Sequence, residues 1–281
     1  MTCGLKRRLR RYLPQLPKDI FKVFVVLLFL FPFYWMFITS FKTYNETIQV
    51  PPTLWPREFT LEAYQTIFSG MDLTHYIKNS VIITLSIIVI QTLVMIPAAY
   101  AFAKYEFAGK RLMFALVLAA FMIPRQITFI PVYIMMARWK LLDTLLPQII
   151  PFGANAFGIF LLRQSFMQVP EEIIEAAKLD NATESQIMTE IMLPMCRSTM
   201  ITIALFSFVS HWNAYFWPLV MTDTDKVRPL TIAIEKLKDL EYGINWNLQM
   251  AGNVLLVAPI IIVLIFASRK ILEAYAYRGV K

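Results

Sequence analysis

Long apolar runs that hold few charged side chains constrain this chain more than any other feature of its sequence. A helix needs about 20 predominantly apolar residues to cross the roughly 30 Å hydrocarbon core of a bilayer. The runs of sufficient length lie at about residues 21–41, 79–103, 112–137, 144–164, 198–221 and 250–270. They predict an all-α integral membrane protein with six transmembrane helices in a single domain, residues 1–281.

Composition and charge also indicate a membrane protein, and they orient its termini. Hydrophobic residues make up 58% of the chain and charged residues 16%, which is unusual for a soluble domain. Most of the basic residues fall in the N-terminal leader and in the segments on its side of the membrane, so the positive-inside rule predicts that both termini are cytoplasmic. The net charge of +8 is explained by basic residues that flank the spans, where they orient the chain and attract anionic lipid. These residues do not indicate nucleic-acid binding.

The sequence offers little for catalysis or for a cofactor. Cys3 and Cys196 provide neither a disulfide framework nor a metal-ligand spacing, and His211 has no second ligand at a suitable distance along the chain. The phosphate-binding pattern G-x-x-x-x-G-K-[ST] does not occur. We therefore expect a membrane domain that is not an enzyme and that binds no metal or cofactor, so that any energy-converting domain must belong to another chain.

A charged segment between two apolar runs, residues 168–195, predicts two short helices. Pro170 suits a first helical turn, and Glu171 and Glu172 favour the positive end of the helix dipole. The first helix should end at about Asp180, because Asn181 tolerates the left-handed conformation of a C-terminal cap. From these residues alone, a docking element and a passive hairpin on the membrane surface are about equally favoured.

The second helix of this segment is predicted from its two ends. Thr183 and Gln186 form a T-x-x-Q capping box, and Ile187 begins an apolar stripe at helical spacing. Pro194 should prevent the helix from continuing. Two rigid arms joined at a sharp corner are therefore expected.

This segment resembles the EAA motif of permease subunits of binding-protein-dependent ABC importers, EAA-x3-G-x9-I-x-LP. The matching residues are Glu175, Ala176, Ala177, Asn181, Ile191, Leu193 and Pro194, with Asn181 in place of the family's glycine. The resemblance implies a cytoplasmic coupling loop in which Glu175, Ala176, Ala177, Asp180 and Asn181 contact an ATPase or form the corner. It also implies that Ile191, Leu193 and Pro194 fix the second arm.

Further stretches, among them "NSVII", "AAYAFAKYEFAGKR", "MIPRQITFIPVYIMM" and "FSFVSHWNAYFWPL", resemble the carbohydrate-uptake group and its maltose-type second permease subunit. The resemblance implies the type I ABC importer fold in a bacterial-type cytoplasmic membrane. The implied partners are a non-identical sister permease, two cytoplasmic ATPase subunits that bind ATP and Mg, and an extracytoplasmic solute-binding protein. A sugar is the implied solute, with glycerol phosphate or another polar solute as the alternative and a membrane scaffold as a weaker one.

Three residues within the predicted spans are candidates for the translocation pathway. Arg125 is a charge near mid-span, which costs about 2.5–3.5 kcal/mol on insertion scales and requires a partner. Its partner could be backbone, water, another chain or an acidic substrate. Trp212 could stack on a sugar and Asn213 could hydrogen-bond to its hydroxyls, although an interfacial aromatic belt predicts the same composition.

Overall fold

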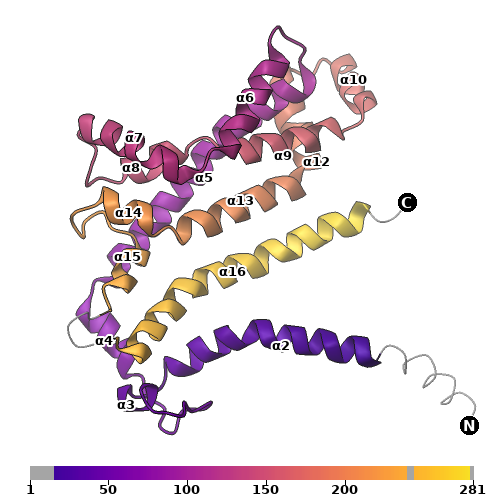
Figure 1. Ribbon diagram of the computed structural model, residues 1–281. Helices are drawn as coiled ribbons and strands as arrows, with labels where there is room; N and C mark the ends of the chain where they lie inside the picture. Colours follow the sequence, from indigo (N-terminus) through magenta and orange to yellow (C-terminus); the bar gives the residue numbers. More distant parts are fainter. Residues whose placement is uncertain (1–15, 239–243, 279–281) are drawn as a thin grey trace, which may run out of the picture. The chain divides into compact units, whose positions relative to one another are not determined.

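The computed structural model describes residues 16–238 and 244–278, and every regular element within these ranges is helical (Figure 1). The elements are α2 (Leu16–Thr39), α3 (Tyr44–Thr47), α4 (Glu62–Gly70), α5 (Leu73–Lys104), α6 (Lys110–Met122), α7 (Arg125–Arg138), α8 (Leu146–Ile149), η1 (Ile150–Phe152), α9 (Ala156–Met167), α10 (Glu171–Leu179), α11 (Glu184–Gln186), η2 (Ile187–Met192), α12 (Leu193–Met195), α13 (Arg197–Trp212), α14 (Phe216–Met221), α15 (Leu230–Glu235) and α16 (Trp246–Arg278). The all-α class predicted from the apolar runs is confirmed.

The helices belong to two compact units of the chain. Unit 1 contains the residues up to Met71 together with Ile234–Val257. Unit 2 contains Asp72–Ala233 and the residues from Ala258 onward. α15 and α16 therefore each contribute residues to both units.

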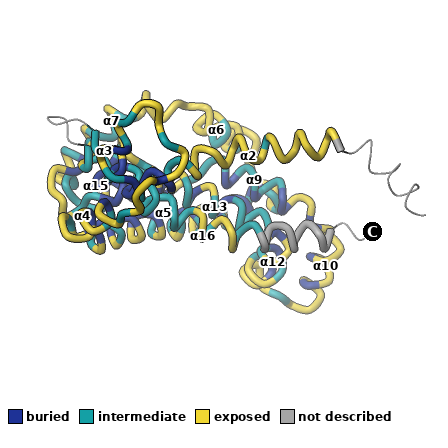
Figure 2. Tube along the Cα trace, turned by 90° about the horizontal axis from the view of Figure 1, so that it is seen from below, coloured by how far each residue is buried: buried dark blue, intermediate teal, exposed yellow. Residues whose placement is uncertain are grey.

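In unit 1, α2 exposes apolar side chains along most of its length, as Figure 2 shows. Phe24, Leu27 and Phe31 are each more than half exposed. An apolar helix with this exposure requires lipid or another chain to cover it. A hydrogen bond joins the segment after α2 to the start of α16. The Asn247 side chain of α16 donates to the Lys42 backbone carbonyl at 3.0 Å.

The 32-residue helix α5 provides much of the core of unit 2. It begins where the Asp72 side chain accepts a hydrogen bond from the His75 backbone N–H. α9 crosses α5 at Gly158, where an added Cβ would lie only 2.5 Å from Met95 Sδ. A glycine is therefore required for α9 to approach α5 this closely.

The third predicted span, residues 112–137, is not one continuous helix. It comprises α6 and α7, which are bent by 96° at the break between them. Pro124 explains the break, because the residue before a proline is disfavoured in the helical conformation and Ile123 is extended at φ −74° and ψ 120°. This apolar run therefore forms a bent pair of helices.

Two other predicted spans are also interrupted. Residues 144–164 are divided among α8, η1 and α9, and α9 starts anew where the Asn155 side chain accepts from the Gly158 N–H at 2.9 Å. Residues 198–221 are divided between α13 and α14. In the described residues, three helices (α2, α5 and α16) are long and apolar enough to span a bilayer alone, and two bent pairs raise this to five at most. The count of six spans stays a prediction.

Candidate functional site

The first arm of the candidate coupling loop is α10, and both of its ends lie within one residue of the sequence prediction. Pro170 precedes the helix in an extended conformation, and Asp180 follows its last residue, Leu179. Asn181 has φ 58°, which is the left-handed conformation predicted for the corner. The predicted end and corner of the first arm are thus confirmed, and its start lies one residue later than predicted, at Glu171.

The EAA triplet is divided between two faces of α10. Ile174 and Ala177 are buried, at 2% and 8% exposed, within the hydrophobic core of unit 2. Glu175 and Ala176 are exposed on the outward face, and Leu179 on that face is 84% exposed. Because 3.6 residues complete a helical turn, adjacent residues of the triplet cannot all face the same way. Ala177 therefore packs inside this chain, on the face of α10 opposite to Glu175 and Ala176, and its predicted contact with an ATPase stays a prediction.

Leu179 is the functional candidate that the motif comparison did not identify. Its side chain is 84% exposed, so no described part of this chain covers it and a partner can reach it. Its position seven residues after Glu172 places it on the same face as Glu175 and Ala176. Helical periodicity was the signal that could have found it.

The second arm begins with the predicted capping box. The Gln186 N–H donates to Thr183 Oγ1, and the Thr183 N–H donates to Gln186 Oε1 at 2.8 Å. The following turn, η2, is a π-helix, and it buries Ile187 and Met192 completely. Residues five apart lie on one face in a π turn, which explains why these two side chains share the core.

Pro194 does not end the second arm, in contrast to the sequence prediction. It lies inside α12, and the chain bends by 79° only after Met195, where α13 begins. Proline is tolerated in a first helical turn because its missing N–H needs no partner there, and the preceding π turn provides such a new start. Leu193 and Ile191 are half-buried against the core, in agreement with a role in fixing this arm.

Polar contacts attach the loop to the end of α5. Tyr100 Oη donates to the Glu184 carboxylate at 2.6 Å, and Lys104 Nζ lies 2.8 Å from the Glu171 carboxylate. The hydrogen bond from Tyr100 is the main reason that the pKa of Glu184 lies below its usual value, and Lys178, at 3.7 Å, adds to it. No sequence pattern pointed to the Tyr100–Glu184 and Lys104–Glu171 contacts, because each joins residues far apart in the chain.

Asn181 provides a direct test of the corner. Asn181→Gly is expected to leave thermal stability and solute uptake near wild type, because glycine adopts φ 58° freely. Asn181→Val is expected to destabilise the subunit by about 1–2 kcal/mol, since a β-branched residue is strained in this conformation. Thermal unfolding of the purified subunit measures both variants. Equal melting temperatures for the two would show that the corner does not require this backbone conformation.

The three pathway candidates lie at the breaks between helices of unit 2. Arg125 is the first residue of α7, is exposed, and has its guanidinium 5.6 Å from the Phe152 ring centre. Across the described ranges, no carboxylate lies within ion-pair distance of it. Asn213 is exposed and donates to its own helix at the Val209 carbonyl, 3.0 Å away. Trp212 is only 3% exposed and stacks on Phe208, so the structure gives its ring a packing role.

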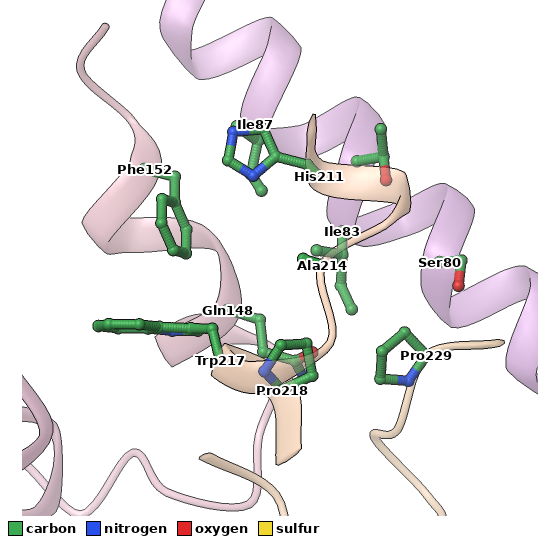
Figure 3. Close-up of a pocket in the computed structure, with 11 residues that line it drawn as sticks. Ser80, Ile83, Ile87, Gln148, Phe152, His211, Ala214, Trp217, Pro218 and Pro229 are labelled. Carbon is green, nitrogen blue, oxygen red and sulfur yellow. The ribbon is translucent and has the colours of Figure 1, made fainter. Parts of the chain in front are cut away.

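A small, mostly apolar cavity lies beside these breaks, and Figure 3 shows His211 and Phe152 facing each other at its edge. Its volume is about 10 Å³, enough for one water molecule and too small for a sugar. Thr84 Oγ1 and Gln148 Oε1, from residues that line it, are buried without a hydrogen-bond partner in the structure described. Among residues 17–238 and 244–268, whose side chains the structure describes, no group of three or more metal-ligating side chains occurs.

Comparisons with known proteins agree with these features. Residues 95–276 match the model of the binding-protein-dependent transport system inner membrane component family. The chain is 31% identical to an arabinooligosaccharides transport system permease protein, AraQ, of Halalkalibacterium halodurans, over 92% of this chain and 93% of that one. It is 27% identical to an sn-glycerol-3-phosphate transport system permease protein, UgpE, of Brucella abortus, over 87% and 89%.

The fold is also similar to that of a solved transporter. The crystal structure of a bacterial ABC transporter involved in the import of the acidic polysaccharide alginate contains a chain with a TM-score of 0.80 and 24% identity, over 92% of this chain and 96% of that one. The chain has several apolar helices and an all-α fold, and the family model matches most of its sequence. This chain belongs to the family of inner membrane components of binding-protein-dependent transport systems.

Proposed function

We propose that this chain is one permease subunit of an ATP-driven importer of a sugar or oligosaccharide delivered by an external binding protein. The observation that carries the proposal is the outward face of α10, where Glu175, Ala176 and Leu179 are exposed. The Lys104–Glu171 ion pair joins this helix to the end of α5. The family match supports the transport role. The permease named for arabinooligosaccharides, among the most similar relatives, supports a sugar as the solute.

The outward face of α10 is suited to transmit motion from an ATPase to the membrane helices. Ile174 and Ala177 of α10 lie in the same hydrophobic core as Tyr100 and Phe102 of α5, and the Lys104–Glu171 ion pair joins the two helices directly. An ATPase subunit that moves on hydrolysis would therefore displace α10 and the end of α5 together. ATP and Mg bind to the two ATPase subunits in this scheme, and Asp180 and Asn181 complete the contact at the corner.

The proposed topology places residues 168–195 and both termini in the cytoplasm, in a bacterial-type cytoplasmic membrane. The excess of basic residues on the leader's side supports this orientation. The exposed apolar length of α2 supports coverage by lipid and by a non-identical sister permease, which would complete the translocation pathway.

A second candidate solute is glycerol phosphate or another anion. The glycerol-3-phosphate permease UgpE is similar to 87% of the length of this chain. In addition, the exposed Arg125 guanidinium could pair with a phosphate or carboxylate of the solute. For a neutral sugar, Arg125 and Asn213 would instead offer hydrogen bonds at the helix breaks.

Uptake into proteoliposomes tests the function and separates the two solutes. The subunit is reconstituted with its sister permease, ATPase and binding protein, and ATP-dependent uptake of labelled arabinotriose, maltotriose and glycerol 3-phosphate is measured. The proposal expects uptake of at least one of the oligosaccharides. Uptake of glycerol 3-phosphate alone would contradict a sugar as the solute, and no ATP-dependent uptake of any solute would contradict the importer.

Arg125→Gln tests the charge at the helix break in the same assay. Sugar uptake is expected to fall by at most about fivefold, which corresponds to the loss of one exposed cation–π contact with Phe152. Arg111→Gln, a charge-matched change at another exposed position, is the control. A much larger loss limited to Arg125→Gln would assign the guanidinium to the solute.

A further inference from the structure

Unit 1 contains a cavity that none of the motifs explains. Its volume is about 250 Å³, and it lies between the end of α2, α3 and the start of α16. A cavity of about 150 Å³ is sufficient to bind benzene. This one can therefore hold a single ring that carries several substituents.

Two indole side chains and several polar groups line this cavity. Trp35 of α2 and Trp246 of α16 provide aromatic surface. Thr39 is 4% exposed, and its Oγ1 has no hydrogen-bond partner among the described residues. A buried hydroxyl without a partner is costly, and rotation of the Thr39 side chain would turn this hydroxyl toward a ligand in the cavity that supplies the missing hydrogen bond.

The charged residues of the cavity are held in place by contacts within unit 1. Lys42 is 1% exposed, donates from Nζ to the Thr53 carbonyl, and lies 4.6 Å from the Trp35 ring centre. Glu46 accepts from Thr53 Oγ1 and from the Arg57 N–H at 3.1 Å. An ammonium has three donors and a carboxylate has four acceptor positions, so both can also bind a ligand.

We propose that this cavity binds one ring of the sugar that the importer carries, an inference that rests on the function proposed above. Indole faces pack against the C–H groups of a sugar ring, and Thr39, Lys42 and Glu46 offer a hydroxyl, a donor and an acceptor to its hydroxyls. The cavity contains one lysine and one glutamate, and this balance of charge favours a neutral sugar over a phosphate. The site is formed by residues of α2, α3 and the start of α16 and by the segments before and after α3, all of which belong to unit 1.

Equilibrium dialysis of the complete membrane complex in nanodiscs, without the binding protein, tests the site. The probes are labelled arabinotriose and maltotriose, with glycerol 3-phosphate for comparison. Trp246→Ala and Thr39→Val should each weaken binding of the imported oligosaccharide by about tenfold. Thr39→Ser keeps the hydroxyl and should bind as wild type. Trp139→Ala, at an exposed tryptophan in unit 2, is the matched control.

The outcomes separate the site from the function. Unchanged binding in Trp246→Ala and Thr39→Val, with normal oligosaccharide import by the wild-type complex, would overturn the site alone. Import of glycerol 3-phosphate in place of both oligosaccharides would overturn the proposed function and the site together. Loss of binding in Thr39→Val with recovery in Thr39→Ser would support the site, because a general packing defect would not follow the hydroxyl.

Discussion

Ala176→Arg is expected to leave the subunit folded and inserted but to abolish its association with the ATPase subunits. Ala176 is exposed on the outward face of α10 beside Glu175 and Leu179, so an arginine has room within this chain. At a contact surface, the same side chain would hold the two proteins apart, and a central contact of this kind is typically worth about 2 kcal/mol or more. We expect at least about a 30-fold loss of ATPase co-purification, with solute uptake reduced in parallel.

Two further variants make this test specific. Leu179→Asp removes the exposed apolar side chain from the same face and should also release the ATPase. Ala108→Arg makes the same change as Ala176→Arg at an exposed alanine in the turn between α5 and α6, and should have little effect. Normal co-purification and uptake with both Ala176→Arg and Leu179→Asp would mean that α10 does not dock on the ATPase.

Ala177→Arg, one residue further along, is expected to destabilise the fold of the subunit itself. Ala177 is buried in the core of unit 2, so an arginine there would be an unpaired charge in an apolar environment. The free energy of unfolding should fall by about 3–5 kcal/mol. We expect less folded protein in the membrane and a melting temperature lower by roughly 10 °C for the purified subunit.

The pair of neighbouring arginine variants distinguishes a contact residue from a core residue. Ala177→Ser, which adds only one oxygen atom, should lower the stability much less than Ala177→Arg and should retain ATPase association. A wild-type melting temperature for Ala177→Arg combined with loss of the ATPase would show that Ala177 faces the partner, and that the burial seen in the subunit changes on assembly.

Local sequence signals predicted the corner of the candidate loop and the start of its second arm correctly. Pro170, Asn181 and the Thr183–Gln186 pair each determine backbone geometry through interactions within a few residues, so no tertiary information was needed. Pro194 was misread because its effect depends on the helix before it. The π turn of η2 allows the proline to begin a new helical segment, and no rule based on the proline alone anticipates that turn.

The features that the sequence could not predict depend on contacts between residues that lie far apart in the chain. Apolar length predicted α2, α5 and α16 well, whereas Pro124 divided an equally apolar run into two helices. Lys42 follows the first apolar run directly, yet it is only 1% exposed. Its burial depends on Thr53 and on Asn247, which is 205 positions later in the chain.

The two faces of α10 have different tolerances to change during evolution. Substitutions at exposed positions usually alter folding stability by less than about 0.5 kcal/mol, so Glu175, Ala176 and Leu179 can vary while the subunit still folds. Ile174 and Ala177 cannot vary in this way, because they fill the core of unit 2. The loop can therefore adapt to a different ATPase through a few surface mutations, each of which leaves the membrane subunit intact.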